Sequence, residues 1–189
     1  MPSFIPPEVL LLGPGPSPVP QRILDALARP TIGHLDPRFV GMMDDLKRLL
    51  RYAFQTGNEL TIPVSAPGSA GMETAFVNVI EPGDTVIVCQ NGVFGGRMRE
   101  NVVRIGAMPV MVNDAFGTPI DLDKVRSALK ANPGARALAF VHAETSTGVE
   151  SDAAESCRLA QEHGPLSIVH AVTSLGGIPV CPAASAADA

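Results

Sequence analysis

From Leu60 onward, short apolar runs alternate with segments of helical character, and this alternation limits the possible folds more than any other feature. Runs of strand length occur at Leu60–Val64, Thr85–Cys89, Met108–Val112, Ala135–Val141 and Leu166–Val169. Buried parallel strands read as continuous apolar runs, and the helices that connect them cover the faces of the sheet. The sequence therefore predicts an α/β fold with a doubly wound, mainly parallel sheet and helices on both faces.

Helical periodicity and capping residues place four of the expected helices. A short helix is expected near Pro20–Ala28, and a longer one over Pro37–Phe54 with Asp36 as its N-cap. A helix over Ser69–Ile80 carries its apolar residues on one face, and Asp121 is the expected N-cap of a fourth.

The expected domain organisation has three parts. Residues 1–19 are rich in proline, which predicts an extended N-terminal arm rather than a helix or strand. Residues 20–180 form one incomplete large domain. Residues 181–189 are small and weakly apolar, which is typical of an unstructured tail.

Composition excludes several classes of partner. The net charge is −5 and no long run of Lys or Arg occurs, so the basic surface that nucleic acid or an anionic membrane requires is missing. The three cysteines form no CxxC pair, which favours a reducing compartment. With no recognisable targeting segment, we expect a cytoplasmic protein.

Polar and small residues gather where the predicted strands end, which is where α/β sheets bind ligands. Ser65–Gly71 leads directly into a helix and could bind a phosphate through backbone N–H groups, although an ordinary strand-to-helix turn has the same composition. In Asn91–Arg97, Phe94 lies among glycines on an expected loop, either as a core residue or as a stacking surface. His142–Gly148 is rich in hydroxyl groups, which a capped turn also explains.

Other kinds of site find little support. The four histidines have neither HxH nor HxxxH spacing and no cysteine accompanies them, so we expect no metal site. No GxSxG elbow is present, which argues against a hydrolase triad.

Five segments, in order, resemble one family. They are LLLGPGPSPVP (10–20), SAPGSAGMETAFVNVIEPGD (65–84), NGVFGGR (91–97), HAETSTGV (142–149) and AVTSLGGIP (171–179). Together they resemble the fold-type I, pyridoxal phosphate (PLP) dependent aminotransferases of class V, most closely the serine/alanine–glyoxylate aminotransferases. The resemblance covers nearly the whole chain up to about Val180.

The resemblance implies roles for particular residues. Gly68 and Ser69 would donate backbone N–H groups to the PLP phosphate. Phe94 would stack on the pyridine ring, and Val172 would pack on its opposite face. Thr145 would hydrogen-bond the ring hydroxyl.

The same resemblance places Gly15 and its neighbours at the substrate site. It also implies a homodimer with shared active sites, a small amino acid as donor and glyoxylate as acceptor.

Two departures from the family pattern affect the expected function. His170 stands where relatives carry an acid that pairs with the pyridine nitrogen, and a neutral imidazole would weaken the electron sink while still orienting the ring. The resemblance also implies a Schiff-base lysine on a loop beyond the printed sequence, and Lys47, Lys124 and Lys130 all have the context of solvated surface residues. No catalytic residue is therefore assigned within this chain.

Two hypotheses follow. One is a PLP-dependent aminotransferase lineage that transfers an amino group from serine, alanine or a similar small amino acid to glyoxylate. The other is a catalytically dead fragment or pseudo-enzyme that at most binds PLP non-covalently or associates with a full-length subunit. Phosphonate and ureidoglycine aminotransferases, which belong to the same class, remain alternatives for the substrate.

Overall fold

The computed structural model of the protein describes residues 4–180. The chain divides near Met43 and Asp44 into an N-terminal unit and a larger C-terminal unit. The expected unstructured tail, residues 181–189, lies outside the described residues.

The N-terminal unit contains the proline-rich segment, the first helix and the start of the second. Residues 4–20 form neither helix nor strand, and α1 follows at Gln21–Leu27. Helix α2, Pro37–Phe54, begins in this unit and ends in the next. The Asp36 carboxylate accepts the backbone N–H of Arg38 at 2.9 Å, so the predicted N-cap of this helix is confirmed.

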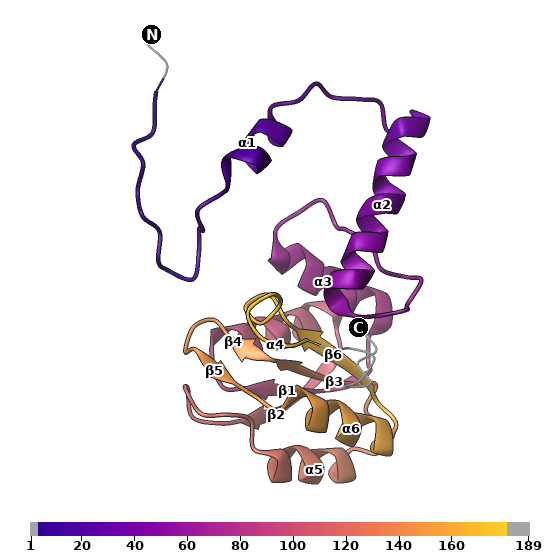
Figure 1. Ribbon diagram of the computed structural model, residues 1–189. Helices are drawn as coiled ribbons and strands as arrows, with labels where there is room; N and C mark the ends of the chain where they lie inside the picture. Colours follow the sequence, from indigo (N-terminus) through magenta and orange to yellow (C-terminus); the bar gives the residue numbers. More distant parts are fainter. Residues whose placement is uncertain (1–3, 181–189) are drawn as a thin grey trace. The chain divides into compact units, whose positions relative to one another are not determined.

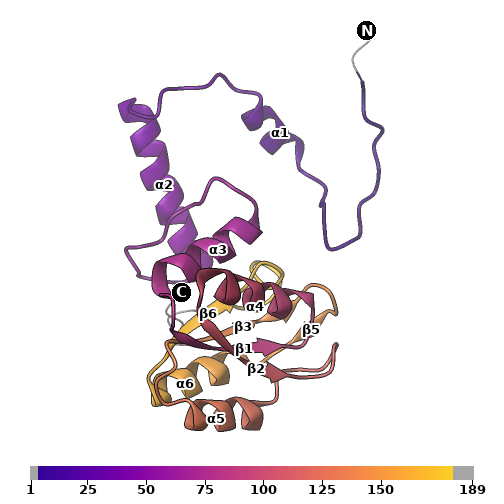
Figure 2. The same ribbon diagram turned by 180° about the vertical axis from the view of Figure 1, so that it is seen from behind.

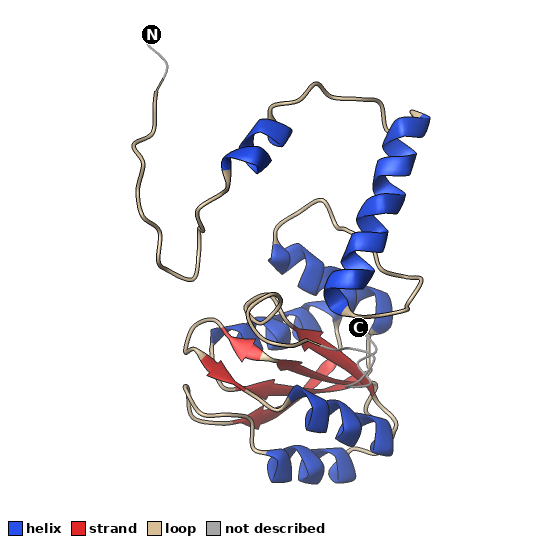
Figure 3. Cartoon of the chain, in the orientation of Figure 1, coloured by secondary structure: helices blue, strands red, loops and turns tan. Residues whose placement is uncertain are grey.

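A four-stranded parallel sheet forms the centre of the C-terminal unit (Figure 3). Its strands are β1 (Thr85–Gln90), β2 (Met108–Asn113), β3 (Ala137–Val141) and β6 (Leu166–His170). Their order is β2-β1-β3-β6, and every pairing between them is parallel. The predicted doubly wound sheet is thus confirmed.

Helices cover both faces of this sheet. Helices α3 (Gly68–Val79) and α4 (Val93–Ile105) lie on one face, and α5 (Leu122–Ala131) and α6 (Ala153–His163) lie on the other (Figures 1 and 2). Asp121 caps α5 as predicted, because its carboxylate accepts the N–H groups of Asp123 and Lys124.

Each strand contributes alternate side chains to two separate apolar cores. Val86 and Val88 of β1 pack with the residues of α3 and α4, whereas Ile87 and Cys89 pack with those of α5 and α6. Successive side chains of a strand point to opposite faces of the sheet, so a strand that is apolar throughout requires a layer of helices on each face. This burial explains why the strands appear in the sequence as unbroken apolar runs.

Two expectations about local structure are wrong. No strand forms at Leu60–Val64, where the chain is extended and Leu60 remains 85% exposed. Pro63 within this run has no N–H to donate to a ladder, and no described strand lies beside it. Phe94 is not on a loop, because α4 already begins at Val93 and includes it in the first turn.

No helix within residues 4–180 has the length and apolar character needed to cross a membrane.

Candidate functional site

Parallel strands bring their carboxyl ends to one edge of the sheet, and the predicted site residues follow three of these ends. Phe94 comes shortly after β1, Thr145 after β3, and His170 is the last residue of β6. Thr145 lies in the turn of a short hairpin, formed by β4 (Ala143–Glu144) and β5 (Val149–Glu150), which follows β3. The loops therefore converge as α/β architecture requires.

Aromatic and cationic side chains meet at Phe94. The His170 imidazole stacks against the Phe94 ring, with centroids 5.4 Å apart and an interplanar angle of 24°. The Arg97 guanidinium lies over the Phe94 ring at 4.7 Å from its centroid. One nitrogen of the same guanidinium also donates to the Ser69 hydroxyl at 3.2 Å. Phe94, Arg97, His170 and Ser69 thus form one connected group.

Helix α3 begins at this group with its first backbone donors unused. Its N-cap, Pro67, offers no side-chain acceptor. Among the described residues, nothing accepts a hydrogen bond from the N–H of Gly68 or of Ser69. Free donors at the positive end of a helix attract anions, so the start of α3 could hold a phosphate.

The start of α4, by contrast, is already occupied by a carboxylate of the protein. The fully buried Glu144 accepts the backbone N–H of Phe94 at 3.1 Å and the Ser146 hydroxyl at 2.8 Å. The Ser146 hydroxyl oxygen accepts the N–H of Val93 at 3.0 Å. Glu144 and Ser146 therefore cap α4 from the β4–β5 hairpin, and the negative charge suits that end of the helix.

Gly92 is required where this cap approaches the backbone. A Cβ atom at Gly92 would lie 2.2 Å from Cγ and 2.4 Å from Cδ of Glu144. No side chain fits at that distance, so the glycine allows the carboxylate to reach the first turn of α4. The absence of a side chain at Gly92 and the cap formed by Glu144 together fix the position of Phe94.

Val172 and Thr145 lie beside the same group. A Cβ atom at Gly68 would contact Cγ2 of Val172 at 3.4 Å, which is an ordinary contact, so the start of α3 adjoins Val172. The hydroxyls of Thr145 and Thr173 are hydrogen-bonded to one another. Val172 itself is 65% exposed.

Burial controls the charge state of His170. Desolvation lowers the pKa of this imidazole below its usual range, while the nearby Glu144 carboxylate opposes the change and Arg97 adds to it. The Nδ1 atom of His170 is buried without a hydrogen-bond partner among the described residues. A neutral imidazole with an unused ring nitrogen can still accept or donate one hydrogen bond to a ligand.

A cleft of about 1300 Å³ opens next to these residues. Its lining includes Gly68, His142, His170 and Val172, whereas Ser69, Phe94 and Thr145 are not part of it. His142 is 6% exposed, and its Nδ1 is a second buried nitrogen that lacks a partner in the described part of the chain. The cleft therefore adjoins the start of α3 and both histidines, whose Nδ1 atoms are themselves buried.

The structure brings all six predicted cofactor residues into one region, namely Gly68, Ser69, Phe94, Thr145, His170 and Val172. Gly15 belongs to the N-terminal unit, and its role at the substrate site stays a prediction. Sequence reasoning missed Arg97 and Glu144. Arg97 stands three residues after Phe94, a helical spacing that could have indicated the contact had the helix been placed there.

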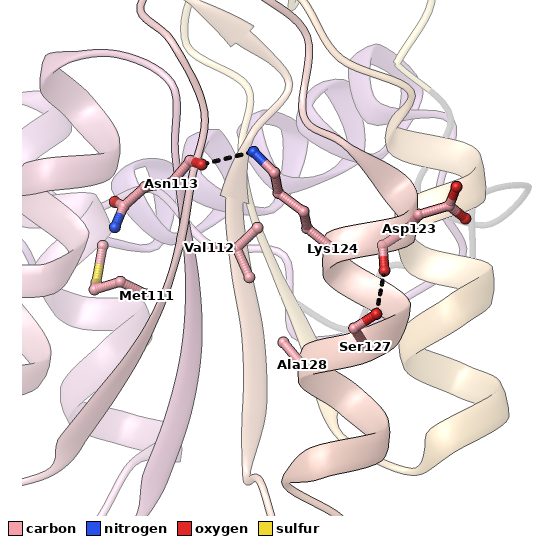
Figure 4. A pocket seen from close by; sticks show the side chains of 7 residues that line it. All are labelled: Met111, Val112, Asn113, Asp123, Lys124, Ser127 and Ala128. Carbon is pink, nitrogen blue, oxygen red and sulfur yellow. Dashed lines mark hydrogen bonds between the residues drawn. The ribbon is translucent and has the colours of Figure 1, made fainter.

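None of the three lysines belongs to this region. Lys124 lines a separate, smaller cleft of about 420 Å³ beside β2 and α5, where its ammonium donates to the Asn113 carbonyl at 3.0 Å (Figure 4). Its hydrogen bond with the Asp114 carboxylate raises the pKa of Lys124, the opposite of what a nucleophilic amine needs. Lys47 pairs with Asp44 at 3.1 Å, and Lys130 is exposed on α5.

Over residues 4–180, no three His, Cys, Asp or Glu side chains gather in a way that could hold a metal ion.

Comparison with known proteins gives a consistent family. No protein-family model matches the chain. The alanine–glyoxylate aminotransferase of Oryctolagus cuniculus is 40% identical over 175 residues, which are 92% of this chain and 44% of that protein. The solved alanine–glyoxylate aminotransferase from Nostoc sp. is 42% identical with a TM-score of 0.92, over 98% of this chain and 50% of that one.

A second solved structure is ureidoglycine–glyoxylate aminotransferase from Bacillus subtilis, which is 32% identical to this chain with a TM-score of 0.94. The match covers 98% of this chain and 48% of that one. The chain thus spans about half the length of the relatives it matches. The similarity in sequence and in backbone structure extends over almost the whole chain. Over nearly its whole length the chain is therefore similar to about half of an alanine–glyoxylate aminotransferase, the family that its five motifs indicated.

Proposed function

We propose that this chain is the PLP-binding part of an aminotransferase that transfers an amino group from serine, alanine or a similar small amino acid to glyoxylate. Relatives named alanine–glyoxylate aminotransferase support the reaction class, and a neighbour named ureidoglycine–glyoxylate aminotransferase supports glyoxylate as the shared acceptor. Gly15 would border the substrate site, as the family resemblance implies. As in the family that the motifs resemble, the protein would act as a homodimer.

The observation that carries the proposal is the difference between two helix starts. The N–H of Phe94 in α4 is satisfied by Glu144, whereas the N–H groups of Gly68 and Ser69 in α3 have no acceptor among the described residues. An anion would therefore bind at α3 and not at α4. Because an aromatic ring lies next to the open start, the matching ligand has a phosphate and a flat ring, as PLP does.

The chain's residues fit this cofactor in most respects. Gly68 and Ser69 would bind the phosphate, Phe94 and Val172 would enclose the ring, and Thr145 would bind the ring hydroxyl. When bound, PLP supplies an electron sink for the carbon from which the amino acid loses its proton. The protein's task is to fix the plane of the ring and to exclude water around it.

His170 departs from the donor set expected of a strong electron sink. Its pKa is lowered by burial, so the imidazole is neutral near pH 7 and cannot balance a protonated pyridine nitrogen as a carboxylate does. A neutral imidazole can still donate one hydrogen bond to an unprotonated ring nitrogen. We infer that His170 orients the ring and leaves its nitrogen unprotonated.

The second hypothesis, a chain that binds PLP without a covalent bond, is favoured by the lysines. Lys124 is engaged with Asn113 and Asp114, and its pKa is raised. Lys47 and Lys130 are absent from the lining of the large cleft. The chain as printed would then hold PLP non-covalently, or associate with a full-length subunit that carries the lysine.

A titration with PLP separates these hypotheses. Absorbance between about 320 and 430 nm is recorded with and without borohydride, followed by mass analysis for a reduced adduct on lysine. We expect saturable binding and no specific adduct. A specific adduct at Lys47, Lys124 or Lys130 would contradict the non-covalent hypothesis and support catalysis by this chain alone.

A pair of phenylalanine variants tests whether the signal comes from the proposed site. Phe94→Leu removes the stacking surface and should weaken PLP binding by about tenfold. Phe116→Leu changes an exposed ring in the loop after β2, and binding should stay as in the wild type. Equal binding by both variants would refute the placement of the ring at Phe94.

A further inference from the structure

Two arginines of α4, Arg97 and Arg104, make no ion pair among the described residues, and of these Arg104 lies in the last turn of the helix while Arg97 lies near its start. Arg99, two residues further along, pairs with Glu100 at 2.8 Å. Arg97 makes no ion pair among residues 4–180, although Glu144 is nearby and buried. Its contacts are instead a hydroxyl group, that of Ser69, and an aromatic face, that of Phe94.

These two contacts belong to two different parts of the proposed site. Ser69 is the second residue of α3, where the phosphate would bind, and Phe94 is the ring against which the pyridine would stack. Phosphate and ring are joined covalently in PLP, so their separation is fixed. A protein gains affinity for such a ligand when its two subsites are already held at that separation.

We propose that Arg97 is a positioning residue, which holds the ring-stacking Phe94 and the phosphate-binding start of α3 at the spacing that a pyridoxal phosphate requires. The proposal rests on the proposed cofactor site. The planar guanidinium suits this role, because it can lie flat on an aromatic ring and still direct an N–H to Ser69. The unpaired positive charge also favours an anion at α3.

The side-chain geometry defines a set of variants. Arg97→Met keeps a long apolar stem and removes both the charge and the donor. Arg97→Lys keeps the charge but loses the planar fork. Arg99→Met is the matched control, because it removes an exposed arginine from the same helix without touching Ser69 or Phe94.

Binding is measured for three probes: PLP, pyridoxal and inorganic phosphate. For Arg97→Met we expect PLP affinity to fall about tenfold, while pyridoxal and phosphate each lose no more than about threefold. Arg97→Lys should restore phosphate affinity but recover PLP affinity only in part. Arg99→Met should match the wild type for all three probes.

The induced circular dichroism of bound PLP gives a readout that does not depend on activity. At saturation, the signal per bound PLP should shrink in Arg97→Met because the ring is no longer held in one orientation. In a Phe94→Leu background the Arg97→Met change should lose most of its effect, since the two residues act on the same ring.

Several outcomes would overturn the inference. Equal PLP affinity of Arg97→Met and wild type would do so, and so would an equal loss for phosphate and PLP, which would make Arg97 a simple counter-ion. Additive effects of Arg97→Met and Phe94→Leu would also contradict it. Failure of the proposed function is distinct from these, because it appears as a wild-type chain that gives no saturable PLP signal.

Discussion

Replacing Gly92 by alanine should disconnect the β4–β5 hairpin from α4. The added Cβ would lie 2.2 Å from Cγ of Glu144, whereas ordinary contacts begin at 3.4 Å. Gly92 has φ −177° and ψ −167°, an extended conformation that alanine also adopts, so the backbone itself adds no strain. The added Cβ would also lie 2.7 Å from the Ser146 hydroxyl oxygen, so the clash must be relieved by movement of both the buried Glu144 side chain and the Ser146 hydroxyl.

The cost follows from the hydrogen bonds that Glu144 makes. Moving its carboxylate by roughly 1 Å would break its bonds to the N–H of Phe94 and to Ser146, and a hydrogen bond to a charged group contributes about 1.5–3 kcal/mol. Overpacking adds about 1–3 kcal/mol to the loss of stability. Alanine also reduces the conformational entropy of the unfolded chain, which offsets up to about 1 kcal/mol of that loss. We expect Gly92→Ala to lower the free energy of unfolding by at least about 3 kcal/mol.

Urea unfolding followed by far-UV circular dichroism measures this change, with Gly96→Ala as the matched control. A Cβ at Gly96 would lie 3.3 Å from the flexible end of Gln90, and alanine is the better helix former. Gly96→Ala should therefore be about 0.5 kcal/mol more stable than the wild type. In a Glu144→Ala background, where only the 2.7 Å approach to the Ser146 hydroxyl oxygen remains, Gly92→Ala should cost less than it does in the wild type. A Gly92→Ala protein as stable as the wild type would refute this account of the cap.

Three further predictions concern the described core and the edge of the sheet. Because burial lowers the pKa of His170, the unfolded chain binds a proton there more readily, so the free energy of unfolding should decrease as the pH falls below about 6.5. Unfolding of wild type and His170→Asn at about pH 7.5 and pH 5.5 checks this, and an identical pH dependence would contradict it. Burial raises the pKa of the Cys89 thiol to about 12, so iodoacetamide should leave Cys89 unmodified in the native protein and alkylate it in urea, as peptide mass analysis would show. Strand β6 pairs with β3 alone among the described strands, and the large cleft beside it is mainly apolar, so we expect the isolated chain to self-associate. A monodisperse, cooperatively melting monomer in sedimentation and thermal scans would be inconsistent with that expectation.

Local sequence patterns were sufficient for the sheet and most of the helices. The runs at β1 and β3 are apolar throughout because both faces are buried, and no other element explains such short runs between helical segments. The same rule failed at Leu60–Val64, where the run is apolar but contains Pro63 and has no neighbouring strand. An apolar run predicts a strand only when a partner is available, and that is a property of the tertiary structure.

The site was predictable as a region because parallel strands end at one edge, but the role of Glu144 was not. In the sequence, Glu144 is the single acid of a hydroxyl-rich segment, and a capped turn explains that segment equally well. The cap in fact serves a helix about fifty residues earlier in the chain, through Phe94. Only the folded chain reveals this long-range partner.

The same long-range cap decides where an anion can bind. Two helices begin near this edge of the sheet, and glycine-containing segments precede or start both of them, so glycine spacing does not distinguish them. Glu144 supplies a negative charge and acceptor oxygens to α4, which makes a second anion there unfavourable. Helix α3 has no such carboxylate in the described structure, and Arg97 adds a positive charge beside it. The proposed phosphate subsite at α3 therefore follows from which helix donors the protein has already used.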